Sequence, residues 1–302
     1  MAEGNGIHDC LIIGAGPGGL QAAIYLGRFS RKALVLDGGG GRTRHARHIE
    51  NFLGQPLITG RELLETGARQ AASFGVEVSK TTALNVSKKD GLFETQTSDG
   101  GVIQSHFIIA ASGVTDIIPK IENLYRFFGE GFYTCIDCDG YRTRGKKLVV
   151  LGGSEKALRL ASAMKQMYTE DVSVILQGFR MPPEYEEEMR QEGINVVEGR
   201  AVRLLGEKNR LEQIELEGGR LLGCEAVMSS FGYTLNDGFL RGLPLKKDAQ
   251  EFKYHTGRSF ESSLPGLYIT GPLTGDDQAV IAAGEGAIAA LDINRRLVEL
   301  YS

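Results

Sequence analysis

The chain opens with short, mainly apolar runs separated by a stretch of helical spacing. DCLII at residues 9–13 and KALVLD at residues 32–37 are the two runs, and LQAAIYLGRF between them has apolar positions spaced for a helix. Short continuous apolar runs are typical of strands that are buried on both faces of a parallel sheet. Residues 9–37 therefore predict a strand, a glycine-rich turn, a helix and a second strand, which together open a dinucleotide-binding fold.

A related pattern recurs in the middle of the chain. There KLVVL is followed by GGSEKA, by the helix-like LRLASAMKQMY and by the apolar DVSVILQ. Each copy is followed by a further helix-like stretch, by strand-like segments and by a buried apolar run. We therefore predict an α/β protein with two three-layer, Rossmann-like domains.

The last sixty residues do not fit the central half. LPGLYITG predicts another buried strand, and DDQAVIAAGEGAIAALDINRRLVEL predicts a long amphipathic helix that has no partner there. Both elements would complete the first domain. We expect a discontinuous domain over residues 1–115 and 245–302, with a second domain over residues 116–244 inserted into it.

Composition and charge limit the classes of molecule that the chain is expected to bind. The formal net charge is −4, with no strong basic excess of the kind that nucleic acids or membrane surfaces attract. The first residues lack a basic segment followed by an apolar one, and no apolar run approaches the roughly 18 residues of a membrane-spanning helix. We expect a cytoplasmic protein whose partners are small molecules or other proteins.

A glycine fingerprint follows the first predicted strand. Glycines in such a turn let a pyrophosphate approach the helix N-terminus. Asp37 ends the second strand, where a carboxylate can accept hydrogen bonds from the ribose hydroxyls of an adenosine. The predicted nucleotide contacts of this turn are Gly14, Gly16, Pro17, Gly18 and Gly19.

Two of the four cysteines are closely spaced. Cys135 and Cys138 stand two residues apart, a spacing that favours reversible disulfide formation and can lower the pKa of one thiol. Asp139 follows directly and could give and take a proton during exchange. Half of a zinc site and a pair of inert thiols are the alternatives, but no second CxxC or close histidine pair completes a zinc site, so we expect no metal. Cys10 and Cys224 lie in apolar runs and are expected to be buried.

The motifs GAGPGGLQAAIYLGR, ENFLG, IIAASG, CIDCDG and AAGEGAIAALD together resemble the low-molecular-weight thioredoxin reductase family over nearly the whole chain. The resemblance implies a homodimeric flavoprotein in which FAD reduces the dithiol pair, and the pair reduces a protein disulfide such as that of thioredoxin. Asp139 would be the catalytic acid. The further FAD contacts that we expect are Gly38, Arg42, Asn51, Gly113, Gly271, Gln278 and Ala279.

Three departures from that family bear on the cofactors. In the second fingerprint Ser154 replaces a close-approach glycine, and Glu155 adds a carboxylate where a pyrophosphate would lie. At the end of the next strand only Arg180 remains of the basic stretch that holds the 2′-phosphate of NADPH. Pro272 stands where the family has an aspartate on the flavin ribityl chain, a role that Asp276 or Asp277 could take over. NADPH is therefore not the expected donor.

The leading hypothesis is an FAD-dependent disulfide oxidoreductase supplied by ferredoxin or another electron-transfer protein. One alternative is a dithiol oxidase, in which electrons flow in the opposite direction, from a dithiol substrate through the cysteine pair and the flavin to oxygen or another acceptor. Another alternative is a nucleotide-binding redox sensor without turnover. The inserted domain could be empty or could hold a second nucleotide or flavin. The basic run from Arg42 to His48 could contact a flavin phosphate, a second nucleotide or an acidic partner, or could be a solvated loop.

Overall fold

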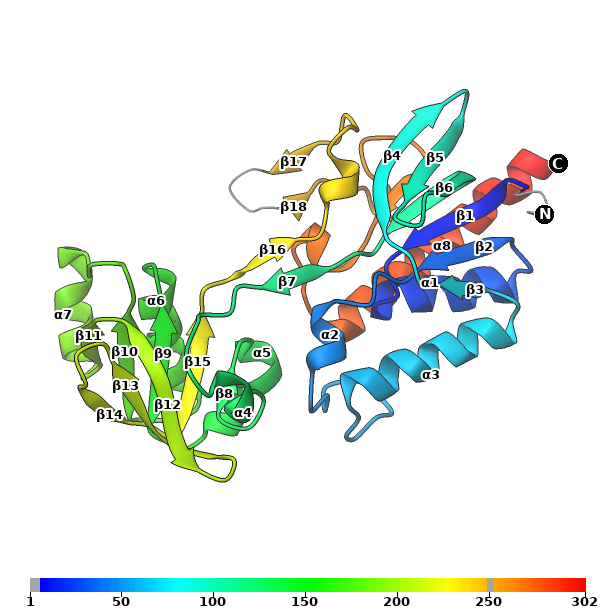
Figure 1. The fold of residues 1–302 in the computed structure, drawn as a ribbon. Helices are drawn as coiled ribbons and strands as arrows, with labels where there is room; N and C mark the ends of the chain where they lie inside the picture. The colour runs from blue at the N-terminus through cyan, green and yellow to red at the C-terminus, as the bar shows by residue number, and fades with distance from the viewer. Residues whose placement is uncertain (1–5, 249–252) are drawn as a thin grey trace. The chain divides into compact units, whose positions relative to one another are not determined.

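The computed structural model describes residues 6–248 and 253–302. The chain forms two compact units: one combines the residues up to Thr115 with Thr234–Ser302, and the other is Asp116–Tyr233 (Figure 1). Both units are α/β with a largely parallel sheet, so the predicted fold class is confirmed. The second unit is inserted into the sequence of the first.

The sheet of the first unit contains β1 (His8–Ile13), β2 (Ala33–Leu36), β3 (Glu77–Ser79), β4 (Ala83–Lys89), β5 (Leu92–Thr97), β6 (Val102–Ala110) and β19 (Leu267–Ile269). Its order is β3-β2-β1-β6-β5-β4, with β19 paired to β6. The first part of β6 pairs antiparallel with β5, and the second part pairs parallel with β1 and β19. The C-terminal ends of the parallel strands therefore all lie at the same edge of the sheet.

Both faces of this sheet are covered. The helical elements of the unit are α1 (Pro17–Arg28), α2 (Arg42–His45), α3 (Gly60–Ser73), η2 (Gly238–Leu240), η3 (Gly271–Thr274) and α8 (Ala279–Tyr301), and a small ladder joins β17 (Lys247–Asp248) to β18 (Lys253–Tyr254). Cys10 and Ile12 pack with α1 and α8 on one face. Leu11 and Ile13 pack with side chains of β4, β5 and η2 on the other. Burial on both faces explains the continuous apolar run in β1.

The second unit repeats this plan. Its five-stranded sheet has the order β11-β10-β9-β15-β8, and an antiparallel sheet of β12, β13 and β14 covers one face. The helices α6 and α7 cover the other face. The elements of this unit are α4 (Leu124–Phe127), β8 (Phe132–Tyr133), α5 (Ile136–Asp139), η1 (Gly140–Thr143), β9 (Leu148–Gly152), α6 (Lys156–Met167), β10 (Val172–Leu176), α7 (Pro183–Gln191), β11 (Asn195–Glu198), β12 (Ala201–Glu207), β13 (Arg210–Leu216), β14 (Leu221–Gly223) and β15 (Ala226–Ser230). The chain crosses between the units within β7 (Val114–Asp116) and β16 (Tyr233–Leu235), which pair with one another.

Two details differ from the sequence expectations. Residues 234–244 were expected in the inserted domain, but they belong to the first unit, because Phe239 and Leu240 are buried in the core beneath β4 and β5. Residues 42–45 form the short helix α2 within a segment expected to be a loop. Among the described residues, no helix is both long and apolar enough to cross a membrane.

A buried carboxylate ties α8 to η3. Glu285 is 4% exposed, and it accepts hydrogen bonds from the backbone N–H of Gly271 and from the hydroxyl of Thr274. Burial raises the pKa of Glu285 to about 7, although these two hydrogen bonds oppose the rise. The folded protein therefore holds a proton on this side chain at pH values where the unfolded chain has lost it.

This linkage predicts a pH-dependent contribution to stability. The contribution of Glu285 is fully present below its ordinary pKa of 4.5 and is lost as the pH rises through about 7. The stability advantage of wild type over Glu285→Gln should therefore fall between pH 5 and pH 8, by on the order of 2 kcal/mol. Thermal unfolding of both proteins across this range measures it, with the exposed Glu184→Gln as control. A constant difference would contradict the linkage.

Candidate active site

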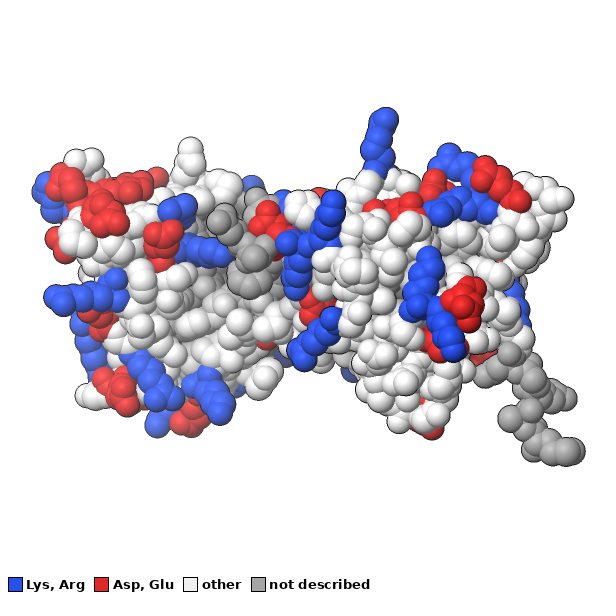
Figure 2. All heavy atoms as spheres, turned by 90° about the horizontal axis from the view of Figure 1, so that it is seen from above, with Lys and Arg blue, Asp and Glu red and all other residues white. Residues whose placement is uncertain are grey.

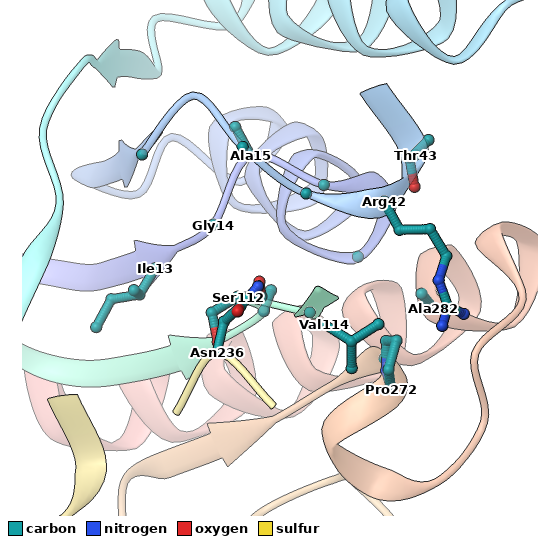
Figure 3. A pocket seen from close by; sticks show the side chains of 18 of the residues that line it. Ile13, Gly14, Ala15, Arg42, Thr43, Ser112, Val114, Asn236, Pro272 and Ala282 are labelled. Carbon is teal, nitrogen blue, oxygen red and sulfur yellow. The ribbon is translucent and has the colours of Figure 1, made fainter. Parts of the chain in front are cut away.

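A cavity of about 420 Å³ lies in the first unit, beyond the C-terminal ends of its parallel strands (Figure 3). Ligands of open α/β sheets bind at this edge, and the volume lies within the usual range for small-molecule pockets. Most of the predicted cofactor contacts line the cavity: Gly14, Gly16, Pro17, Gly18, Asp37, Gly38, Arg42, Gly113, Gly271, Gln278 and Ala279. Gly19 and Asn51 are not among its lining residues.

The fingerprint forms a tight turn from β1 into α1. Gly14 has a φ of 115°, and an added Cβ would lie 2.3 Å from the carbonyl oxygen of Ala111. An added Cβ at Gly19 would lie 1.9 Å from the carbonyl oxygen of Gly14. Gly16 caps the helix, Pro17 begins it, and its first turn has no acidic residue. The backbone N–H groups at this helix N-terminus can therefore receive an anionic group from the pocket.

Asp37 lies directly after β2, as the sequence predicted. Its Oδ1 accepts a hydrogen bond from the N–H of Gly39 at 2.9 Å, and its Oδ2 lies 3.3 Å from a guanidinium nitrogen of Arg44. These contacts fix the carboxylate at the pocket wall and leave some of its lone pairs for further donors. The position suits an acceptor for ribose hydroxyls.

Two polar contacts join the segment after β2 to the segment before α8. Arg42 Nη1 lies 2.6 Å from Asp277 Oδ2, and both residues line the cavity. Figure 3 shows the Arg42 side chain extending toward Pro272 and Ala282. Asn51 Nδ2 donates to Gln278 Oε1 at 3.0 Å, so Asn51 lies beside a lining residue. Sequence reasoning named these residues but could not pair them, because the partners are far apart in the chain.

Buried polar groups in the wall provide a test of whether a nucleotide cofactor fits. Ser112 and Thr270 line the cavity, and their hydroxyls are buried without a hydrogen-bond partner among the described residues. Buried hydroxyls normally have partners, so a ligand with phosphate or ribose oxygens would satisfy them. At Gly41 and Gly113 an added Cβ would meet no atom within 4 Å, which leaves open space along the backbone. The pocket fits FAD in these respects, and the sequence reasoning missed both hydroxyls.

Pro272 lines the pocket without a polar side chain. The backbone N–H of the neighbouring Gly271 donates a hydrogen bond to the carboxylate of Glu285. Asp277 lines the cavity, and it is the cavity-lining carboxylate nearest in sequence to Pro272, which stands where the family has an aspartate. Asp277 is engaged by Arg42, so the pocket has a charged pair where the resemblance implied a single aspartate.

The two redox candidates lie in the second unit. Cys135 and Cys138 form a disulfide, with their Cα atoms 5.3 Å apart. Cys135 is the cap of α5, and its sulfur accepts a hydrogen bond from the N–H of Cys138 at 3.1 Å. Asp139 is the last residue of α5, and its Oδ1 lies 3.5 Å from Nε of Arg142. The structure therefore brings the predicted pair and acid together within one helical turn.

The other two cysteines have a different environment. Cys10 and Cys224 are buried, and burial raises the pKa of both thiols, that of Cys224 to about 12. A buried neutral thiol is a poor nucleophile. These residues behave as small apolar side chains, in agreement with the expectation from sequence.

The second fingerprint forms the turn from β9 into α6. Glu155 lies at the start of α6, and its Oε1 lies 2.8 Å from Nη2 of Arg159. Nε of Arg159 donates to the hydroxyl of Tyr185 at 3.0 Å. Gln177, at the position that corresponds to Asp37, accepts a hydrogen bond from the N–H of Ala201 at 3.3 Å. Glu155, Arg159 and Gln177 are therefore engaged with other protein groups.

The chain is similar to known proteins over most of its length. Residues 8–287 match the family described as pyridine nucleotide-disulphide oxidoreductase. The chain is 30% identical to a thioredoxin reductase of Mycoplasmopsis pulmonis, over 97% of this chain and 98% of that protein.

Two solved structures are similar over nearly their whole length. One is the crystal structure of HlmI, with a TM-score of 0.89 at 28% identity over 99% of this chain and 95% of that one. The other is a thioredoxin reductase from Streptococcus pyogenes, with a TM-score of 0.88 over 98% of this chain and 100% of that one. Its 22% identity shows the fold alone. With the family match, the chain belongs to the pyridine nucleotide-disulphide oxidoreductases, as a flavin-dependent disulfide oxidoreductase of the thioredoxin-reductase-like class.

Proposed function

We propose that the chain binds FAD in the pocket of the first unit and exchanges electrons between the flavin and the disulfide of a thioredoxin-like protein through Cys135 and Cys138. One observation carries the proposal: a disulfide between cysteines two residues apart, followed at once by an acid, in a chain of this family. Such a pair can be reduced and re-formed by thiol–disulfide exchange.

The first unit supplies the groups that would hold FAD. The N–H groups at the start of α1 would bind the pyrophosphate, and Asp37 would accept hydrogen bonds from the adenosine ribose. Asn51 and Gln278, already hydrogen bonded to one another, would lie at the flavin end. When bound, FAD supplies transfer of electron pairs.

The second unit would not use NADPH as its electron donor. Glu155 places a carboxylate at the start of α6, and Arg159 is paired with it and with Tyr185. The helix α7 adds acidic side chains nearby, and the charge of Glu188 acts on Arg159. Like charge here opposes a phosphate-bearing donor. Ferredoxin or another electron-transfer protein is the proposed source.

An apolar stripe on α8 supports the proposal of a homodimer. Ile281, Ile288, Leu291 and Val298 lie on one side of the helix, and each is at least 40% exposed. An exposed apolar stripe on an otherwise charged surface marks a protein interface.

On the face shown in Figure 2, acidic and basic side chains are interspersed on each unit, without a broad basic surface.

The function is tested by re-oxidation of the flavin. Protein reduced anaerobically with dithionite should regain flavin absorption when oxidised thioredoxin is added, because the pair passes its electrons on. Cys138→Ser should slow this at least 100-fold, since no disulfide can form, whereas the buried Cys224→Ser should match wild type. Re-oxidation of Cys138→Ser at the wild-type rate would remove the pair from the mechanism. No response of the wild type would favour the sensor without turnover.

The donor is tested by stopped-flow reduction with NADPH, NADH and reduced ferredoxin, side by side on one preparation. Reduced ferredoxin should bleach the flavin rapidly, and neither nicotinamide should, because the second unit has poor phosphate contacts. Rapid bleaching by NADPH would overturn this part of the proposal. Flavin extracted from the same protein should amount to one per chain, and two per chain would place a second flavin in the inserted unit. Oxygen uptake with an added dithiol would favour the oxidase direction.

The homodimer is tested by light scattering during gel filtration. The wild type should elute with twice the chain mass, and Ile288→Glu should elute as a single chain, because a charge would be buried in the apolar contact. Leu84→Glu is a matched control, since Leu84 is an exposed apolar residue on β4. A monomeric wild type would contradict the proposed use of this stripe.

A further inference from the structure

The chain that follows the redox pair is fixed by two close contacts. The buried hydroxyl of Thr143 donates to the carbonyl oxygen of Gly140 at 2.7 Å and closes the 3-10 turn η1. Gly140 packs so tightly that an added Cβ would lie 2.7 Å from the ring of Tyr168. These contacts therefore hold the backbone of residues 139–142, directly after the redox pair, in one conformation.

This turn places a cation against the acid of the redox motif. Nε of Arg142 lies 3.5 Å from Oδ1 of Asp139, and each side chain is 22% exposed. The guanidinium carbon lies 5.2 Å from the ring centroid of Tyr141, within the range of a cation–π contact. An opposite charge at this distance favours the ionised carboxylate, and partial burial weakens the screening by water.

Other titratable groups also lie near this turn. Tyr133 of β8 donates to the carbonyl oxygen of Glu130, and burial together with the charge of Asp139 raises the pKa of Tyr133 to about 12, so it is neutral at physiological pH. The charged residues near this turn in the sequence include the acids Glu130 and Asp137 and the bases Arg144, Lys146 and Lys147.

We propose that Arg142 is a positioning residue for the redox pair, which holds Asp139 ionised and offsets its charge so that a thiolate can form beside it. The proposal rests on the proposed function, because it assigns a role within dithiol exchange. Without Arg142, the negative charge of Asp139 would oppose a second negative charge on the adjacent sulfur. With Arg142, the ion pair of Asp139 and Arg142 has no net charge, so the carboxylate opposes the thiolate less.

The exchange balances with the two cysteines and water. In the reduced pair, one thiol gives its proton to water, and that thiolate attacks a sulfur of the partner disulfide. The partner S–S bond breaks, a mixed disulfide forms, and the leaving sulfur takes a proton from water. The second enzyme thiol then attacks the enzyme sulfur of the mixed disulfide and re-forms the bond between Cys135 and Cys138. Its proton goes to the second partner sulfur, so two electrons and two protons pass to the partner.

The test is the pH dependence of alkylation of the reduced wild-type chain by iodoacetamide, read at Cys135 and Cys138 by mass spectrometry. Arg142→Gln should raise the pH midpoint of alkylation by about 0.5–1 unit, the lower part of the usual effect of a close opposite charge because the pair is partly exposed. Arg142→Lys should keep the wild-type midpoint, since it restores the charge. Asp139→Asn should lower the midpoint, and Asp139→Asn with Arg142→Gln should return it near wild type.

Arg144→Gln is the matched control, because it removes one positive charge from the same segment without touching Asp139, and it should not move the midpoint. An unchanged midpoint in Arg142→Gln, or equal shifts in Arg142→Gln and Arg142→Lys, would overturn the proposal. If Arg142→Gln fails to fold, an unchanged midpoint in Asp139→Asn would overturn it equally. The assay needs no donor and no partner protein, so a missing shift leaves the proposed function standing, whereas wild-type thiols inert at every pH would remove both.

Discussion

The pocket depends on contact between the backbones of α1 and α8. An added Cβ at Gly286 would lie 2.0 Å from the carbonyl oxygen of Gly18, and one at Gly18 would lie 2.9 Å from that of Ala282. Only glycine permits this approach, at a cost in helix propensity that packing of the two helices must offset. The contact brings the start of α8, from residues far along the chain, against the fingerprint turn. The two walls of the pocket therefore meet because neither helix has a side chain between them.

The same layered plan serves different chemistry in the two units. In the first unit a cavity lies at the edge of strand C-termini, lined by glycines and by two residues whose buried hydroxyls lack partners among the described residues. In the second unit Glu155, Arg159 and Tyr185 interact with one another at the equivalent turn, and the disulfide lies in the short segment after β8. A fold can keep its core while its edge residues change function, since the core is set by the buried apolar runs of the strands and the edge is not.

Local sequence patterns predicted most of the fold, and within the site they predicted the glycine turn and Asp37. The apolar runs and glycine turn located β1, α1 and Asp37, because strand burial and tight turns are encoded by neighbouring residues. The pairs Arg42–Asp277 and Asn51–Gln278 were not predictable, since each joins residues more than 200 positions apart. The position of residues 234–244 was wrong because Phe239 and Leu240 are apolar in either domain, and only packing decides which core they enter. The burial of Glu285 was not predicted, because it depends on contact between α8 and η3.

The central claim is that a flavin held by the first unit and the disulfide of the second form one electron-transfer system. It is tested most directly by photoreduction of the flavin in anaerobic protein, followed by alkylation and mass spectrometry of the peptide that contains Cys135 and Cys138. Both cysteines should be alkylated when the flavin is reduced and should remain unmodified when the sample is kept in the dark. A disulfide that persists beside a fully reduced flavin, or a purified chain that binds no FAD, would contradict the claim.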